Sequence, residues 1–95
     1  MEVITPQEFK KKINGVFILD VREKDEYDQE HIENAIHIPL GEVIRDNGAN
    51  IPRNQEIVVY CRSGFRSGIA AQFLESRGYS NIKNLEGGFS MWSLL

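Results

Sequence analysis

Cys61 is the only cysteine in the chain, and its neighbours give it the surroundings of a reactive thiol. The segment around it reads Tyr60-Cys61-Arg62-Ser63-Gly64-Phe65-Arg66-Ser67-Gly68. A continuous apolar run precedes the cysteine and predicts a buried strand, and the apolar spacing after Gly64 predicts a helix. A thiol in this turn faces the unpaired N–H groups of a helix start and is flanked by two arginines, and both should lower its pKa. We therefore predict that Cys61 is a thiolate nucleophile.

The same loop has features of an anion-binding site. Backbone N–H groups in a turn of glycine and small residues can curl into a cradle for an anion. Arg62 and Arg66 add planar donor pairs suited to an oxyanion such as a sulfonate or a phosphate. The alternative interpretation is a buried structural cysteine with surface arginines, but apolar packing would not need the intervening Arg-Ser-Gly.

The elements that would position this loop follow from the apolar pattern. Short apolar runs predict strands at residues 16–19, 35–38, 57–60 and 82–85, and continuous runs are typical of strands covered on both faces. Helices are expected at residues 6–13, 24–30 and 40–44, from Gly64 to the Arg77-Gly78 stop, and around Phe89 and Trp92, with a loop at 46–52. This alternation predicts one α/β domain, residues 1–95, with a mainly parallel sheet between helices. Because ligands of such folds bind beyond the carboxyl ends of the strands, Cys61 is expected at that edge.

Composition narrows the possible partners. The chain has 95 residues and a net charge of −3. It therefore lacks the excess of basic residues that would indicate nucleic acid or an anionic membrane as a partner. The apolar runs are far shorter than the ~20 residues of a membrane span, and the N-terminus lacks a signal-peptide pattern, so a cytoplasmic protein is expected. One cysteine cannot form an internal disulfide or a multi-cysteine metal site, and His31 and His37 make a poor metal site, so no metal is expected.

The loop resembles the active-site loop of the rhodanese family of sulfurtransferases, and the likeness extends over roughly residues 3–94. The upstream signature is matched by Leu19-Asp20-Val21-Arg22-Glu23, Glu26-Tyr27, His31-Ile32, Ala35 and Ile38-Pro39-Leu40, and the C-terminal one by Leu85-Glu86-Gly87-Gly88-Phe89 with Trp92. These blocks keep the order and spacing of the family. The resemblance implies the rhodanese-like three-layer fold, with about five strands between helices.

The resemblance also implies a mechanism and its partners. The Cys61 thiolate would take the sulfane sulfur of a donor such as thiosulfate, form a persulfide, and pass the sulfur to cyanide or to a thiol, including a protein thiol. The loop N–H groups from Arg62 to Ser67 would stabilise the anionic persulfide. No cofactor is implied.

Two other functions remain open at this stage. Cysteine phosphatases place five residues between cysteine and arginine, whereas four separate Cys61 from Arg66, which predicts a smaller cradle suited to one sulfur atom. A non-catalytic binding module, or a sulfur relay fed by another protein, would have the same sequence, although a binding module alone would not need Cys61.

Several residues outside the loop carry weaker expectations. Asp20 and Arg22 follow a predicted strand, and we expect an ion pair that ties two connections together and supports the loop indirectly. The acidic run from Glu23 to Glu30 is expected to be a solvated helix face. His37 is expected to face solvent, and Asn34 to tolerate a left-handed turn where the family often has glycine.

Overall fold

A computed structural model of residues 1–95 shows five parallel strands in one sheet, in the order β1-β5-β4-β2-β3. The strands are β1 (Glu2–Ile4), β2 (Phe17–Asp20), β3 (Ile36–His37), β4 (Ile57–Tyr60) and β5 (Ile82–Leu85). Strand β4 is central, with β2 and β5 on either side of it. The residue that follows β4 therefore lies in the middle of the carboxyl edge of the sheet.

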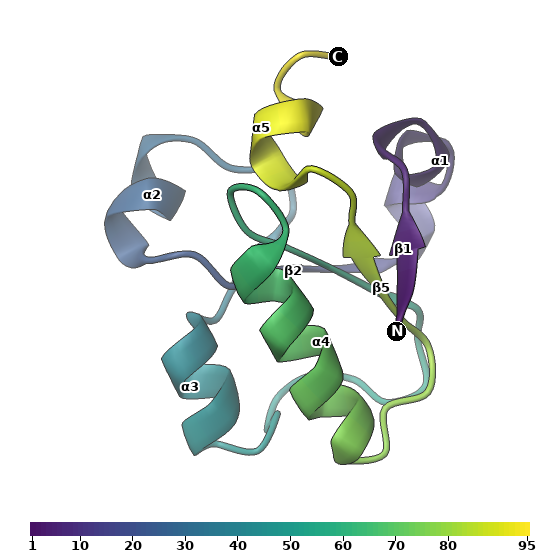
Figure 1. The fold of residues 1–95 in the computed structure, drawn as a ribbon, viewed down its shortest axis with the longest axis vertical. Helices are drawn as coiled ribbons and strands as arrows, with labels where there is room; N and C mark the ends of the chain where they lie inside the picture. Colours follow the sequence, from purple (N-terminus) through teal and green to yellow (C-terminus); the bar gives the residue numbers. More distant parts are fainter.

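Helices cover both faces of this sheet. They are α1 (Pro6–Lys12), α2 (Lys24–Gln29), α3 (Leu40–Arg45), α4 (Phe65–Ser76) and α5 (Gly88–Trp92), and a short 3₁₀ helix follows α1 at Ile13–Gly15. Helices α3 and α4 lie side by side on one face, whereas α1, α2 and α5 supply side chains to the other face (Figure 1). The predicted three-layer α/β fold is confirmed.

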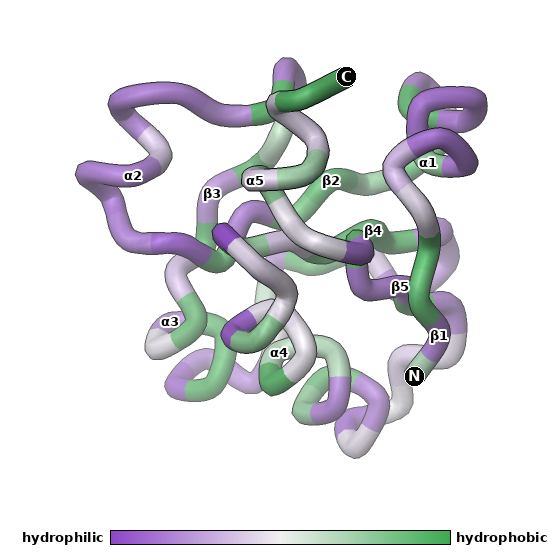
Figure 2. The backbone as a smooth tube through the Cα atoms, turned by 45° about the horizontal axis from the view of Figure 1, so that its top comes forward, coloured by the Kyte–Doolittle hydropathy of each residue, from purple (hydrophilic) through white to green (hydrophobic).

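The core consists of two apolar clusters, one on each face of the sheet. In β4, Ile57 and Val59 belong to the cluster under α3 and α4, and Val58 and Tyr60 belong to the cluster under α1 and α5. All four are buried, which is why the sequence of this strand is continuously apolar. Figure 2 shows the contrast between the apolar central strand and the polar helix α2.

Local signals placed most elements to within one or two residues. The predicted helix start is confirmed: Thr5 caps α1, its hydroxyl accepts the Glu8 N–H, and the Glu8 carboxylate accepts the Thr5 N–H. Asn34 has φ 70°, as expected for a left-handed turn. The strand β1 was not among the strands predicted from apolar runs, because only Ile4 of its three residues is buried. No helix of the structure has both the length and the apolar character needed to cross a membrane.

The two histidines stack against Tyr27. The ring centroids of His31 and His37 lie 3.8 and 4.6 Å from that of Tyr27. His37 Nε2 also lies 2.7 Å from the carbonyl oxygen of Arg22, so the expectation that His37 faces solvent was wrong. His37 thus joins β3 to α2, whereas His31, just beyond the end of α2, packs on the same Tyr27 ring from its own helix.

Candidate active site

Cys61 lies in the turn between β4 and α4, at the carboxyl edge of the sheet. The turn is tight, because α4 begins at Phe65. Gly64, immediately before the helix, has φ 110°, a conformation that other residues rarely adopt. The glycine is therefore required for the chain to curl around the cysteine before it enters the helix.

The curled loop encloses the sulfur of Cys61. The backbone N–H groups of Gly64 and Ser67 point at Sγ from 3.1 and 3.3 Å, and the Ser67 hydroxyl oxygen lies 3.3 Å from it. Cys61 is only 1% exposed. Burial raises the pKa of the thiol, but the hydrogen bonds from Ser67, Gly64 and Ser63 outweigh it and hold the pKa below its ordinary value. This geometry agrees with the predicted reactive thiolate.

Asn84 holds the loop from the neighbouring strand β5. Its Oδ1 accepts a 2.6 Å hydrogen bond from the Ser67 hydroxyl, and its Nδ2 donates to the Gly64 carbonyl oxygen at 3.1 Å. Asn84 is buried, and sequence reasoning missed it. The available signal was a polar residue in the middle of a short strand whose apolar neighbours are buried.

Arg62 and Arg66 were both expected to offer their donors to an anion, but in the structure they differ. Arg66 directs its planar donor pair at the carboxylate of Glu26, with distances of 2.8 and 3.0 Å. The side chain of Arg62 is 69% exposed, and its Nε lies 3.7 Å from Glu26 Oε2. The hydrogen bonds from Arg66 lower the pKa of Glu26 to about 2. The acidic run on α2 is thus not uniformly solvated: Glu26 turns toward the Cys61 loop, which corrects the expectation for residues 23–30.

Asp20 and Arg22 form the expected ion pair, and it is buried. Arg22 Nη2 lies 2.8 Å from Asp20 Oδ2 and also donates to the carbonyl oxygen of Glu30 at 2.7 Å. The hydroxyl of Tyr60 donates to the same Asp20 oxygen at 2.6 Å and accepts the N–H of Ile32 at 3.1 Å. Since Tyr60 immediately precedes Cys61, this cluster fixes the strand end from which the loop departs.

Helix α5 closes the loop from the other side. The N–H groups of Phe89 and Ser90 donate to the carbonyl oxygens of Cys61 and Arg62 at 2.8 and 3.0 Å. Gly88 makes this approach possible, because a Cβ there would lie 2.5 Å from the Cys61 carbonyl oxygen. The Gly87-Gly88 pair is accordingly a turn packed closely against the backbone of Cys61 and Arg62.

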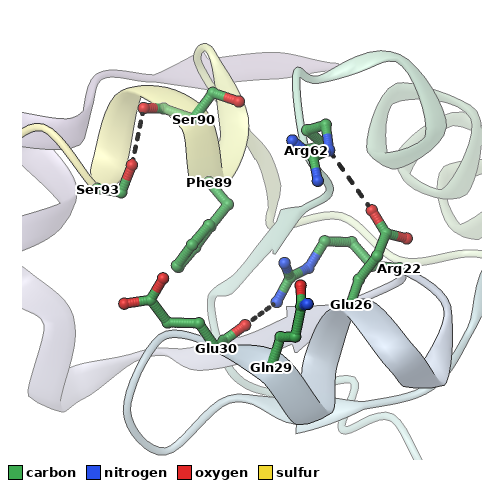
Figure 3. Close-up of a pocket in the computed structure, with 8 residues that line it drawn as sticks. All are labelled: Arg22, Glu26, Gln29, Glu30, Arg62, Phe89, Ser90 and Ser93. Atoms are coloured by element: carbon green, nitrogen blue, oxygen red, sulfur yellow. Dashed lines mark hydrogen bonds and ion pairs between the residues drawn. The ribbon is translucent and has the colours of Figure 1, made fainter.

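A polar pocket of about 210 Å³ lies beside the loop, between α2 and α5. It is lined by Arg22, Glu26, Gln29, Glu30, Arg62, Phe89, Ser90 and Ser93. Arg62 projects into it toward Glu26, and Arg22 lies deep in it beside the ring of Phe89 (Figure 3). Cys61 does not line this pocket, so the pocket adjoins the Cys61 loop and does not contain the cysteine. Phe65, on the other side of the loop, is 76% exposed.

The comparisons with known proteins agree with this geometry. The family model for the rhodanese-like domain matches residues 5–95. The chain belongs to the rhodanese-like domain family.

Named relatives of this rhodanese-like domain include sulfurtransferases. The thiosulfate sulfurtransferase GlpE of Coxiella burnetii is 33% identical over 85% of the chain and 75% of its own length. The thiosulfate sulfurtransferase PspE of Escherichia coli is 40% identical over 73% of the chain and 67% of its own length. A Bacillus subtilis protein, "Putative sulfur carrier protein YrkF", is 39% identical over 95% of the chain, and the chain spans only half of that protein.

Solved structures confirm the fold. A rhodanese-related protein from Thermoplasma volcanium superposes with a TM-score of 0.92 at 33% identity, covering 99% of this chain and 92% of that one. A rhodanese-like domain protein from Staphylococcus aureus gives a TM-score of 0.88 at 35% identity, covering 97% and 91%. The resemblance seen in the sequence is therefore confirmed as family membership.

Proposed function

We propose that this rhodanese-like domain is a sulfurtransferase in which Cys61 carries the transferred sulfur, and that residues 1–95 act as one such domain. The observation that carries the proposal is the set of backbone donors around Cys61: the nitrogens of Gly64 and Ser67 lie 3.1 and 3.3 Å from Sγ, and their N–H groups donate to it. Such donors stabilise a negatively charged sulfur in the way that an oxyanion hole stabilises oxygen. The active-site loop in this proposal comprises Cys61, Arg62, Ser63, Gly64, Phe65, Arg66 and Ser67.

The reaction takes two displacement steps. The Cys61 thiolate attacks the outer sulfur of thiosulfate, the S–S bond of the donor breaks, and its electron pair leaves with sulfite. Cys61 is then a persulfide anion. Cyanide or a thiolate attacks the outer sulfur of that persulfide, and the Cys61 thiolate is regenerated as the new bond forms. Atoms and charge balance in both steps, and ping-pong kinetics are expected.

Burial of Cys61 restricts the donor. Cys61 is 1% exposed, so a donor must present a small atom at its end to reach the thiolate through the loop. A sulfane sulfur at the end of a molecule, as in thiosulfate or a persulfide, meets this requirement. A tetrahedral phosphoryl group is larger than one sulfur atom, so the enclosure favours sulfur transfer over the phosphatase alternative.

A sulfur relay fed by a partner protein is the second candidate, and the arrangement of the arginines favours it specifically. Arg66 is already paired with Glu26, which leaves Arg62 as the exposed arginine of the loop. A small anionic donor therefore finds few free charged donors here. In the relay, a protein persulfide would supply the sulfur and activity with thiosulfate would be incidental.

Intact mass measurement tests the proposal. The purified protein is incubated with thiosulfate, and a Cys61→Ser variant is treated identically. We expect a gain of one sulfur atom in the wild type alone. No gain from thiosulfate, but a gain from a persulfidated protein, would select the relay. No gain from either donor would refute sulfur transfer, and accompanying hydrolysis of a phosphate ester would point to the phosphatase.

A further inference from the structure

Glu26 is the carboxylate that meets both arginines of the active-site loop. Its Oε1 lies 2.8 Å from Arg66 Nη1, and its Oε2 lies 3.0 Å from Arg66 Nη2 and 3.7 Å from Arg62 Nε. Forty residues separate Glu26 from Arg66 in the chain. The contact is therefore made only by the fold, across the gap between α2 and the loop.

The carboxylate of Glu26 is held in place by its own helix. Its Oε1 also accepts the N–H of Glu23 at 3.0 Å, in the capping box that begins α2. Helix α2 is fixed in turn, because the Tyr27 hydroxyl donates to the Ala35 carbonyl and Arg22 donates to that of Glu30. The negative charge of Glu26 is thus a fixed part of the loop surroundings.

This charge changes what an incoming donor meets. Two guanidinium groups beside Cys61 would by themselves attract a dianion, but the Glu26 carboxylate cancels one of their positive charges and occupies the planar donor pair of Arg66. Glu26 also lines the pocket beside the loop, facing Arg62 (Figure 3). A charged molecule near the loop therefore interacts with all three groups.

We propose that Glu26 is a specificity-determining residue that weakens the binding of dianionic sulfur donors relative to monoanionic ones. The inference deepens the proposed function and rests on it. The physical reason is Coulomb's law, since a fixed carboxylate repels a dianion about twice as strongly as a monoanion at the same distance. The Arg66–Glu26 pair adds to this, because a donor that uses the Arg66 fork must first displace the carboxylate.

Two donors of similar shape separate charge from chemistry. Thiosulfate carries two negative charges, and methanethiosulfonate, in which a methyl group replaces one oxygen, carries one. In both cases the Cys61 thiolate attacks the terminal sulfur and the donor's S–S bond breaks. Its electron pair leaves with sulfite or with methanesulfinate, so the Cys61 persulfide is the same product.

The experiment measures kcat and KM for both donors, with cyanide as acceptor, in the wild type and in Glu26→Gln. We expect the KM for thiosulfate to fall about fivefold in the variant and the KM for methanethiosulfonate, which feels half the repulsion, to fall only about twofold, with the difference shrinking at high salt. Asp25→Asn is the matched control. It removes a carboxylate of the same helix, and the Asp25 carboxylate forms no ion pair with the loop arginines. It should leave the ratio of the two KM values unchanged.

A second variant separates charge from geometry. Glu26→Asp keeps the negative charge but shortens the side chain, so we expect it to retain a KM ratio close to that of the wild type even where kcat falls. If Glu26→Gln changes both donors equally, or changes neither, the specificity role is refuted. A wild type that gains no sulfur on Cys61 in the mass measurement would refute the proposed function itself, whereas a sulfur gain with an unmoved KM ratio would refute only the role of Glu26.

Discussion

The hydroxyl of Ser67 donates to Oδ1 of Asn84 across 2.6 Å, and the oxygen of this Ser67 hydroxyl lies 3.3 Å from Sγ of Cys61. A hydroxyl has one proton to donate, so it serves Asn84 or a Cys61 thiolate, but not both at once. When Cys61 is a thiol, its S–H can donate to Ser67 while Ser67 donates to Asn84. When Cys61 is a thiolate or a persulfide anion, Ser67 can turn its proton to the sulfur. The pair thus adapts to both charge states of the cysteine.

Removal of the Ser67 hydroxyl should make Cys61 less acidic. In Ser67→Ala the thiolate loses a donor, so the pKa of Cys61 should rise and its alkylation by iodoacetamide at pH 7 should slow about tenfold. The measurement is the alkylation rate as a function of pH, whose midpoint should move to higher pH. Ser76→Ala is the control, because the Ser76 hydroxyl donates to the Phe73 carbonyl at the far end of α4. An unmoved midpoint in Ser67→Ala would contradict the role given to this hydroxyl.

Substitution of Asn84 should loosen the loop as a whole. Asn84→Ala removes the acceptor for Ser67 and the donor to the Gly64 carbonyl, and the lost buried hydrogen bonds should cost about 1–3 kcal/mol of unfolding free energy. We expect sulfur loading of Cys61 to slow about tenfold as well, because the N–H group of Gly64 is no longer held toward the sulfur. Urea unfolding and the rate of mass gain measure the two effects. Asn81→Ala, at an exposed site on the turn before β5, should change neither, and loading at the wild-type rate in Asn84→Ala would exclude a positioning role for Asn84.

The hydroxyl of Tyr60 should matter for stability and little for sulfur chemistry. Tyr60→Phe leaves Asp20 without one donor and the Ile32 N–H without its acceptor, at an expected cost of about 1–3 kcal/mol. Breaking the ion pair itself, as in Arg22→Met, leaves a buried charge uncompensated and should cost more, about 3–5 kcal/mol. Urea unfolding measures both. Folded Tyr60→Phe should still gain one sulfur atom from thiosulfate, and failure to do so would mean that the cluster acts on Cys61 directly.

The ion pair between Glu26 and Arg66 should stabilise the fold in a manner that depends on pH. Hydrogen bonds from Arg66 lower the pKa of Glu26 to about 2 in the folded protein, below the value of about 4.3 expected in the unfolded chain. This contribution is therefore complete above about pH 5 and is lost as the pH falls toward 2. Unfolding free energies of the wild type and Glu26→Gln, measured between pH 7 and pH 2, should converge at the acidic end. A constant difference over the whole range would show that the pair contributes nothing through its charge.

Much of the fold could be predicted because its signals are local. The buried run from Ile57 to Tyr60 and the helix starts at residue 6 and after Gly64 each depend on a few neighbouring residues, and the structure confirms all three. Strand β1 escaped prediction because an edge strand of three residues, two of them exposed, leaves no apolar run.

The sequence alone determined that Cys61 follows a buried strand, precedes a helix, and lies in a loop that can curl around a sulfur atom. These properties are set by residue types and spacing within a few positions. The tertiary structure alone decided that Asn84 holds this loop from β5 and that Glu26 takes the donors of Arg66. Those contacts join residues 20 and 40 positions apart. No local pattern records them, because strand order and helix placement determine which distant side chains meet.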